Sequence, residues 1–159
     1  MEKLLHYVWM HKLLPSRTLK TTDGTEVEVM DPGQHNGNQG PDFLNARIKM
    51  GGIVWAGNVE IHTCSSDWNR HKHHTDPVYN TTILHVVEHA DAEIRTQSGQ
   101  TVPQVTIVIP QEVKDNYEEL LRTTDYPRCH KFVRGIEPLK AHAWFDALLA
   151  ERMEARAKR

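Results

Sequence analysis

Two strand-forming segments joined by Gly51-Gly52 constrain the fold of this 159-residue chain more than any other feature. Residues 43–49 alternate apolar and polar side chains, as a half-buried strand does. Residues 53–63 follow the two glycines, which readily adopt the left-handed conformations of a tight turn. The sequence therefore predicts an antiparallel hairpin that brings residue 42 opposite the region of residues 60–62. Leu44, Ala46 and Ile48 are expected to share one face of the first strand.

Further periodic segments surround this hairpin and predict a mixed α/β (α+β) domain. Asp23-Gly24 is a strong two-residue turn signal between two short strand-like runs within residues 18–30. Asp76-Pro77 ends a helix that begins near Asp67, because the residue before proline avoids the α region. We expect a mixed central sheet flanked by helices. The remaining expected elements are helices over 2–14, 111–122 and from Glu137-Pro138 onward, and strands over 82–87 and 102–109.

Bulk composition limits the class of protein. Hydrophobic residues make up 38% and charged residues 25% of the chain, which is typical of a globular domain. No apolar run approaches the roughly 20 residues that span a bilayer. The net charge of −2 gives no general attraction for nucleic acid. Cys64 and Cys129 are far apart and lack CxxC spacing, so we expect no disulfide framework and a cytoplasmic location.

The last segment indicates how the chain is divided. We expect residues 1–136 to form one domain and residues 137–159 a C-terminal helix. The apolar stripe of this helix needs a partner surface, and no glycine cap follows it. A continuation into a further C-terminal region is therefore expected. The stripe consists of Trp144, Phe145, Leu148, Leu149 and Met153.

The hairpin carries the residues with the clearest chemistry. Side chains two apart on a strand share a face, which groups Glu60 with His62. The turn brings Asp42 opposite them, and two close carboxylates repel each other unless a cation or proton lies between them. Mg²⁺ or Mn²⁺ suits such an oxygen-rich pair and can activate water against a phosphodiester. We therefore predict Asp42 and Glu60 as metal ligands, with Asp42, Glu60 and His62 as the catalytic set.

The order of elements over residues 2–88 resembles the restriction-endonuclease-like αβββαβ core of the PD-(D/E)XK nuclease superfamily. Pro41-Asp42 matches the PD pair, and Glu60-Ile61-His62 matches the second motif with histidine in the place of lysine. The resemblance implies metal binding by Asp42 and Glu60 and a nucleic-acid substrate. An acid from the first helix sometimes joins such sites, and Glu2 is the candidate here.

A second resemblance covers nearly the whole chain. The strings GPDFLNAR (40–47), WAGNVEIH (55–62), SDWxxHxHHxD (66–76) and LHVV (84–87) resemble a bacterial domain-of-unknown-function family. Its members are typically longer than this chain, in agreement with the uncapped last helix. This resemblance implies no established activity.

Eleven histidines are the most unusual feature of the composition. Asp67, His71 and His74 are spaced i, i+4 and i+7, which predicts one face of a helix beside the hairpin. His62, His71 and His74 are an alternative set of Zn²⁺ ligands, because zinc favours imidazole. Alternatively, these histidines have no role in binding: they form a polar helix face, and His85 is a hydrogen-bonded residue of the core. The residues predicted to contact substrate or support the metal ligands are Gln39, Asn58, Asp67, Arg70, His71, His74 and His85.

Three functions are thus compatible with the sequence. The first is a metal-dependent nuclease that uses the acidic pair. The second is a catalytically degenerate nuclease-like domain that binds nucleic acid or a protein, since the lysine is missing. The third is a zinc-binding hydrolase or a zinc-stabilised domain built on the histidines. Cys64, which shares a face with His62, is in addition a candidate nucleophile.

Overall fold

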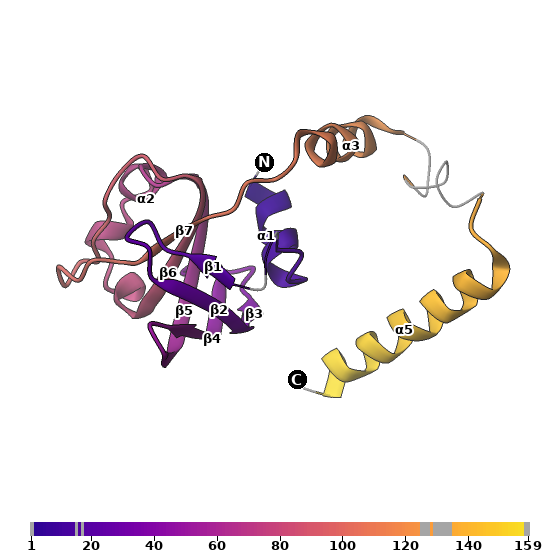
Figure 1. Cartoon of the computed structure of the whole chain (residues 1–159), viewed down its shortest axis with the longest axis horizontal. Coiled ribbons are helices and arrows are strands. Elements are labelled where there is room, and N and C mark those ends of the chain that lie inside the picture. The colour runs from indigo at the N-terminus through magenta and orange to yellow at the C-terminus, as the bar shows by residue number, and fades with distance from the viewer. Residues whose placement is uncertain (1, 15, 17, 125–127, 129–134, 158–159) are drawn as a thin grey trace. The chain divides into compact units, whose positions relative to one another are not determined.

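The computed structural model of the protein describes residues 2–14, 16, 18–124, 128 and 135–157. The chain forms two compact units, Met1–Lys114 and Asp115–Arg159. The first unit contains the sheet and the second contains helical segments (Figure 1). The domain boundary expected at residue 136 stays a prediction. None of the described helices is both long and apolar enough to cross a membrane.

A mixed sheet of seven strands, flanked by helices, forms the first unit and confirms the predicted fold class. Its order is β1-β2-β4-β5-β6-β7, and β3 pairs with β4. Pairing is antiparallel from β1 to β5 and parallel from β5 through β6 to β7 (Figure 1). The strands are β1 (Thr18–Lys20), β2 (Glu26–Asp31), β3 (Gln34–His35), β4 (Phe43–Met50), β5 (Ile53–Cys64), β6 (Thr82–His89) and β7 (Gln104–Thr106).

The predicted β4–β5 hairpin is present, with Met50 opposite Ile53 across the Gly51-Gly52 turn. An irregularity between Phe43 and Ala46 shifts the register, and Asn45 adopts a left-handed φ of 58° there. Leu44 is accordingly only half-buried, whereas Ala46 and Ile48 are fully buried. Phe43 is fully buried in its place, because the irregularity changes which side chains of β4 point inward.

Helix α1 (Glu2–Met10) packs against β5 and buries Leu5 and Trp9 completely. It ends before the predicted residue 14, since Lys12 adopts a left-handed φ of 51°. The Lys12 ammonium donates to the backbone oxygen of Met30 at 2.6 Å, and Trp9 Nε1 donates to that of Pro32 at 3.0 Å. These bonds hold α1 against the end of β2 and the loop that follows it.

The connection from β5 to β6 differs most from expectation. Instead of one helix to residue 75, α2 covers only Asp67–Arg70 and two 3₁₀ turns follow, η1 (His73–Thr75) and η2 (Pro77–Thr81). Lys72 breaks the helix with a left-handed φ of 64°. Trp68 of α2 is fully buried. Its cluster also contains Tyr79, Ile94 and Val102.

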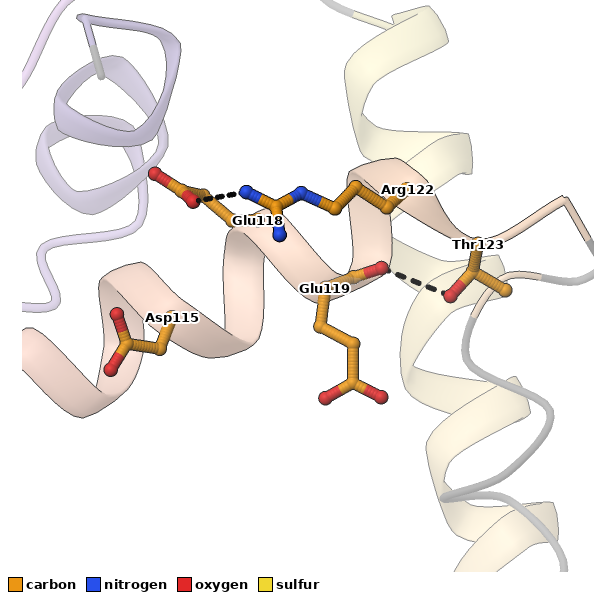
Figure 2. A pocket seen from close by; sticks show the side chains of 5 residues that line it. All are labelled: Asp115, Glu118, Glu119, Arg122 and Thr123. Atoms are coloured by element: carbon orange, nitrogen blue, oxygen red, sulfur yellow. Dashed lines mark hydrogen bonds and ion pairs between the residues drawn. The ribbon is translucent and has the colours of Figure 1, made fainter.

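The helices predicted near the C-terminus are present as α3 (Gln111–Arg122) and α5 (Pro138–Ala157). No residue of α5 is buried, so its apolar stripe is exposed. A hollow along α3 is lined by side chains of that one helix and by Thr123 (Figure 2). Its contacts are local, with Arg122 paired to Glu118 at 3.0 Å and Thr123 Oγ1 donating to the Glu119 backbone oxygen. They stabilise the end of the helix.

Candidate metal centre

The candidate site lies on the C-terminal half of β5, where both faces of the strand are buried. Val59 and Ile61 point into the apolar core and have no exposed surface. Glu60 and His62 occupy the other face and are only 4% and 2% exposed. β5 lies here between β4 and β6, so these polar side chains need partners from the surrounding chain.

Asp42 and Glu60 interlock across the hairpin. The Asp42 N–H donates to Glu60 Oε2 at 3.0 Å, and the Ile61 N–H donates to Asp42 Oδ2 at 2.9 Å. His6, on α1, places its Nε2 3.3 Å from the same Asp42 oxygen. The two acids that the hairpin was expected to bring together are therefore neighbours. Glu60 Oε1 remains directed toward the histidines.

Electrostatics make this acidic pair unfavourable without a cation. Burial, followed by the charge of Asp42, raises the pKa of Glu60 to about 9. Burial alone would lower the pKa of His6, but the hydrogen bond and charge of Asp42 outweigh it and raise that pKa. Metal-free Glu60 thus carries its proton at neutral pH, whereas a bound cation would favour the carboxylate.

Three imidazoles gather above Glu60. His62, His71 and His73 each offer one nitrogen, and these nitrogens all lie within 4.8 Å of one another. His62 Nε2 is 3.0 Å from His71 Nδ1, and Glu60 Oε1 is 3.1 Å from His73 Nε2 and 3.6 Å from His62 Nε2. Burial and the neighbouring imidazoles lower the pKa of His62 to about 2, and burial lowers that of His73. Both rings are neutral at pH 7, which is the form that binds metals. This group is therefore close enough to hold a metal ion.

These side chains line a cavity of about 460 Å³. Its lining includes acids from four separate places in the chain and, among the described residues, contains neither lysine nor arginine. Such a lining attracts a cation and repels an anion until a cation is bound. The lining residues are Glu2, Asn38, Gln39, Gly40, Asp42, Glu60, His62, His71, His73, Asp76 and Tyr79.

Several predicted residues meet at this cavity. Gln39 and His71 line it together with Asp42, Glu60 and His62. Glu2, the acid expected from the first helix, lines it as well. His85 lies behind the lining and is fully buried, with its Nε2 2.8 Å from His62 Nδ1. The catalytic roles predicted for these residues stay predictions.

Other predicted residues lie outside the lining. Asn58 accepts from the Asn45 N–H and donates to Thr81 Oγ1. Asp67 accepts from the Cys64 N–H and pairs with Arg70 at 2.8 Å. The common face expected for Asp67, His71 and His74 does not form, because α2 ends at Arg70 and the left-handed Lys72 follows. His73 points inward instead, and His74 is exposed.

Sequence reasoning missed several lining or contact residues. His73 was obscured by the expected helix, in which it would lie on a different face from His71. His6 follows Glu2 by four residues on α1, so the same helical face offered a signal for it. Tyr79 is 7% exposed and contributes to the core, but it also lines the cavity. Asp76 was read only as a helix stop.

The thiol of Cys64 does not suit nucleophilic catalysis. Desolvation, aided by Asp67, raises the pKa of Cys64, which reduces the thiolate fraction at neutral pH. Cys64 forms no disulfide. Cys129, named with it above, lies outside the described residues.

Comparison with known proteins gives one match. A family model described as a protein of unknown function (DUF2851) matches residues 2–159. Neither the curated proteins nor the solved structures give a match to this chain.

Proposed function

We propose that this protein, which belongs to the DUF2851 family of unknown function, is a metal-dependent hydrolase of phosphodiester bonds. The ion would be held by His62, His71, His73 and Glu60. One observation carries the proposal: three imidazole nitrogens lie within 4.8 Å of one another, beside the oxygen of a buried carboxylate. Imidazoles and a carboxylate that line one cavity are a donor set that binds divalent metals.

The donor set favours Zn²⁺, or a similar transition metal, over Mg²⁺. Imidazole suits zinc, copper, iron and nickel, whereas Mg²⁺ requires oxygen ligands. Two nitrogens 3.0 Å apart, as in His62 and His71, can share one ion at zinc–nitrogen distances of about 2.0–2.1 Å. When bound, such an ion would polarise a phosphoryl oxygen and lower the pKa of an attacking water.

The surrounding residues supply the rest of the chemistry. Asp42 is fixed by the Ile61 N–H and pairs with His6, so its carboxylate is held in place to accept a proton from water. His62 occupies the place of the nuclease lysine but is neutral, and acts here as a ligand. The phosphodiester class is supported by the PD and ExH motifs and by their placement, the first immediately before β4 and the second on its antiparallel neighbour β5.

The acidic pair supports a second candidate, an Mg²⁺- or Mn²⁺-dependent nuclease with Asp42 and Glu60 as the ligands. Its supporting observation is the reciprocal bonding of these two residues. A degenerate, non-catalytic domain is the third, supported by the absence of lysine and arginine among the described lining residues. The three candidates differ in metal preference and activity.

Calorimetric titration separates them. We expect metal-free protein to bind one Zn²⁺ ion far more tightly than Mg²⁺, and His71→Ala and Glu60→Gln to weaken Zn²⁺ binding strongly. His74→Ala is the matched control, because His74 is the exposed neighbour of His73. Equal losses in His71→Ala and His74→Ala would contradict the site. If the protein instead binds Mg²⁺ or Mn²⁺ more tightly than Zn²⁺, and Asp42→Ala abolishes that binding, the result would favour the nuclease that uses the acidic pair.

Activity needs its own assay. Metal-loaded protein is expected to cleave bis(p-nitrophenyl) phosphate and at least one of single-stranded DNA, double-stranded DNA or RNA. Glu60→Gln should abolish this cleavage and His74→Ala should leave it intact. Tight Zn²⁺ binding without cleavage of any of these substrates would leave a metal-binding, non-catalytic domain and overturn the hydrolase proposal.

A further inference from the structure

We propose that Tyr79 and Trp68 are positioning residues that hold the imidazole of His73 in one orientation, with its Nε2 directed at the metal position beside Glu60. This role rests on the proposed metal centre and adds the residues that orient one of its ligands. His73 begins the short 3₁₀ turn η1, directly after the left-handed Lys72. A ligand on so short a turn is held less precisely than one on a strand, so it needs support from its surroundings.

The metal-facing nitrogen of His73 is not oriented by a hydrogen bond. Its Nε2 is buried and has no aligned hydrogen-bond partner among the described residues, although it lies 3.1 Å from Glu60 Oε1. A hydrogen bond on a ring nitrogen commonly fixes the orientation of a histidine ligand. Packing against neighbouring side chains therefore has to set the direction of this ring.

Three rings surround the imidazole of His73. The ring of Tyr79 lies against its face, with the centroids 3.9 Å apart and the planes inclined by 30°. The ring of Trp68 meets it edge to face, at 5.3 Å and 75°. The ring of His62 is stacked with it at 5.3 Å and 20°. Because the lone pair of Nε2 lies in the plane of the imidazole, the ring that stacks on this plane determines where the lone pair points.

The two aromatic side chains are themselves fixed. Trp68 is fully buried, and its Nε1 donates to the backbone oxygen of Arg95 at 3.0 Å. Tyr79 lies on the turn η2, which is capped by the Asp76 carboxylate through the N–H of Val78 at 2.9 Å. The rings of Trp68 and Tyr79 also contact each other, at 5.6 Å and 76°. A ligand supported by side chains whose own conformations are fixed is held precisely.

This arrangement explains parts of the sequence run SDWxxHxHHxD (66–76) that the proposed metal ligands leave unused. Trp68 supplies the edge-to-face contact, and Asp76 caps the turn that carries Tyr79. The stacking contact requires the ring of Tyr79 and not its hydroxyl, so phenylalanine should replace it. Val102 belongs to the same core cluster as Tyr79 but does not line the cavity, which makes it the internal control.

The first test is a nuclear Overhauser measurement between the ring protons of His73 and Tyr79 in metal-free wild type. We expect strong cross-peaks, and Tyr79→Phe should retain the corresponding ones. In Tyr79→Leu the ring protons of His73 should change their chemical shifts, because the stacked ring current is lost. Absence of the cross-peaks in the wild type would overturn the role of Tyr79. The measurement needs neither metal nor activity, so it does not depend on the metal-centre proposal.

The second test is Zn²⁺ affinity by calorimetry. Tyr79→Leu should weaken binding by about 10-fold or more, as loss of a residue that orients a ligand does. Tyr79→Phe should bind Zn²⁺ near the wild-type affinity. Val102→Ala should be less stable but bind as the wild type does. With Co²⁺ in place of Zn²⁺, the visible absorption spectrum should change in Tyr79→Leu and stay unchanged in Val102→Ala, since only the former alters the geometry around the ion.

The outcomes separate the positioning role from the metal centre. Wild-type affinity in a folded Tyr79→Leu would overturn the role of Tyr79 even if the metal centre exists. Equal losses in Tyr79→Leu and Val102→Ala would overturn it as well, because they would show a general effect of packing. Should Tyr79→Leu fail to fold, the wild-type cross-peaks and the affinity of Tyr79→Phe decide. A wild type that binds no Zn²⁺ would overturn the metal centre itself, whatever the cross-peaks show.

Discussion

The two halves of β5 invert the usual distribution of side chains. In its first half Ile53, Val54 and Trp55 are 61%, 47% and 43% exposed, although all three are apolar. In its second half Glu60 and His62 are almost completely buried, although both are polar. The difference arises from the neighbours, because β6 begins at Thr82, opposite Asn58. Before that point β5 pairs with β4 alone in the described sheet.

This contrast supports the proposal that the functional site lies in the second half of β5. Exposed apolar side chains on a hairpin end are common and cost little. Buried carboxylates and imidazoles are expensive unless partners compensate for lost hydration. The partners in the second half are other titratable groups, so the compensation is incomplete without a cation. A site that is costly for the folded chain is a candidate for selection by function rather than by stability.

The largest expected effect is on stability, and it tests whether apolar side chains in the two halves of β5 differ in burial. Ile61→Ala, at a fully buried position, should lower the free energy of unfolding by about 2–5 kcal/mol. Val54→Ala, at an exposed position of the same strand, should change it by less than about 0.5 kcal/mol. Urea denaturation measures both. Similar losses in the two variants would show that the halves of β5 do not differ as described.

The junction between the halves gives the next effect. A Cβ on Gly57 would lie 2.4 Å from Ile83 Cγ2 and 2.8 Å from the Thr81 backbone oxygen. Gly57→Ala should therefore destabilise the protein by about 1–3 kcal/mol, as overpacking does. Gly37→Ala is the control, since nothing lies within 4 Å of its added Cβ. A Gly57→Ala variant as stable as Gly37→Ala would contradict the close approach of β5 to the start of β6.

The pH dependence of stability tests the buried polar side chains in the second half of β5. Folded Glu60 keeps its proton up to about pH 9, whereas unfolded Glu60 loses it near 4.5. The folded state therefore binds more protons in this window, and stability falls as pH rises, by at most about 1.4 kcal/mol per pH unit for one group. The pKa values of His62, His73 and His85 are lowered by burial, so these residues make stability rise with pH. Their effect is confined to pH values below the ordinary histidine pKa of 6.5.

From pH 6.5 to 9 metal-free protein should thus lose stability, with His6, whose pKa is raised, adding to the loss in the lower part of the window. Glu60→Gln should flatten most of this slope, and saturating Zn²⁺ should remove it in the wild type. Thermal unfolding across the pH range provides the measurement. A wild-type slope equal to that of Glu60→Gln would mean that Glu60 ionises normally.

The smallest effect concerns the hairpin surface. Trp55→Ser should leave the free energy of unfolding within about 0.5 kcal/mol of the wild type and leave Zn²⁺ affinity unchanged. Chemical denaturation and calorimetry on the one variant check both. A large loss of either would show that the exposed half of β5 contributes to the core or to the site.

What could be predicted from sequence was local. The meeting of Asp42 with Glu60 follows from strand alternation and a glycine turn, and neither needs knowledge of distant residues. The bulge at Asn45 and the left-handed Lys72 could not be predicted in the same way. Both are ordinary polar residues in unusual conformations that only tertiary packing selects.

The consequences for the site were specific. Because the break at Lys72 was not foreseen, His74 was chosen as a ligand candidate where the structure turns His73 toward Glu60. The contact between His85 Nε2 and His62 Nδ1 depends on parallel pairing between distant segments, which no local pattern reveals. Local sequence patterns thus predicted that Asp42 and Glu60 meet, whereas the position of His73 beside them depends on tertiary contacts.

The central claim is that the buried polar half of β5 is a metal centre. Its most direct test is elemental analysis after metal-free protein is dialysed against buffered Zn²⁺, with His73→Ala and His74→Ala prepared in parallel. We expect one zinc per chain in the wild type and in His74→Ala, and substantially less in His73→Ala. No bound zinc in the wild type, or full retention in His73→Ala, would contradict it.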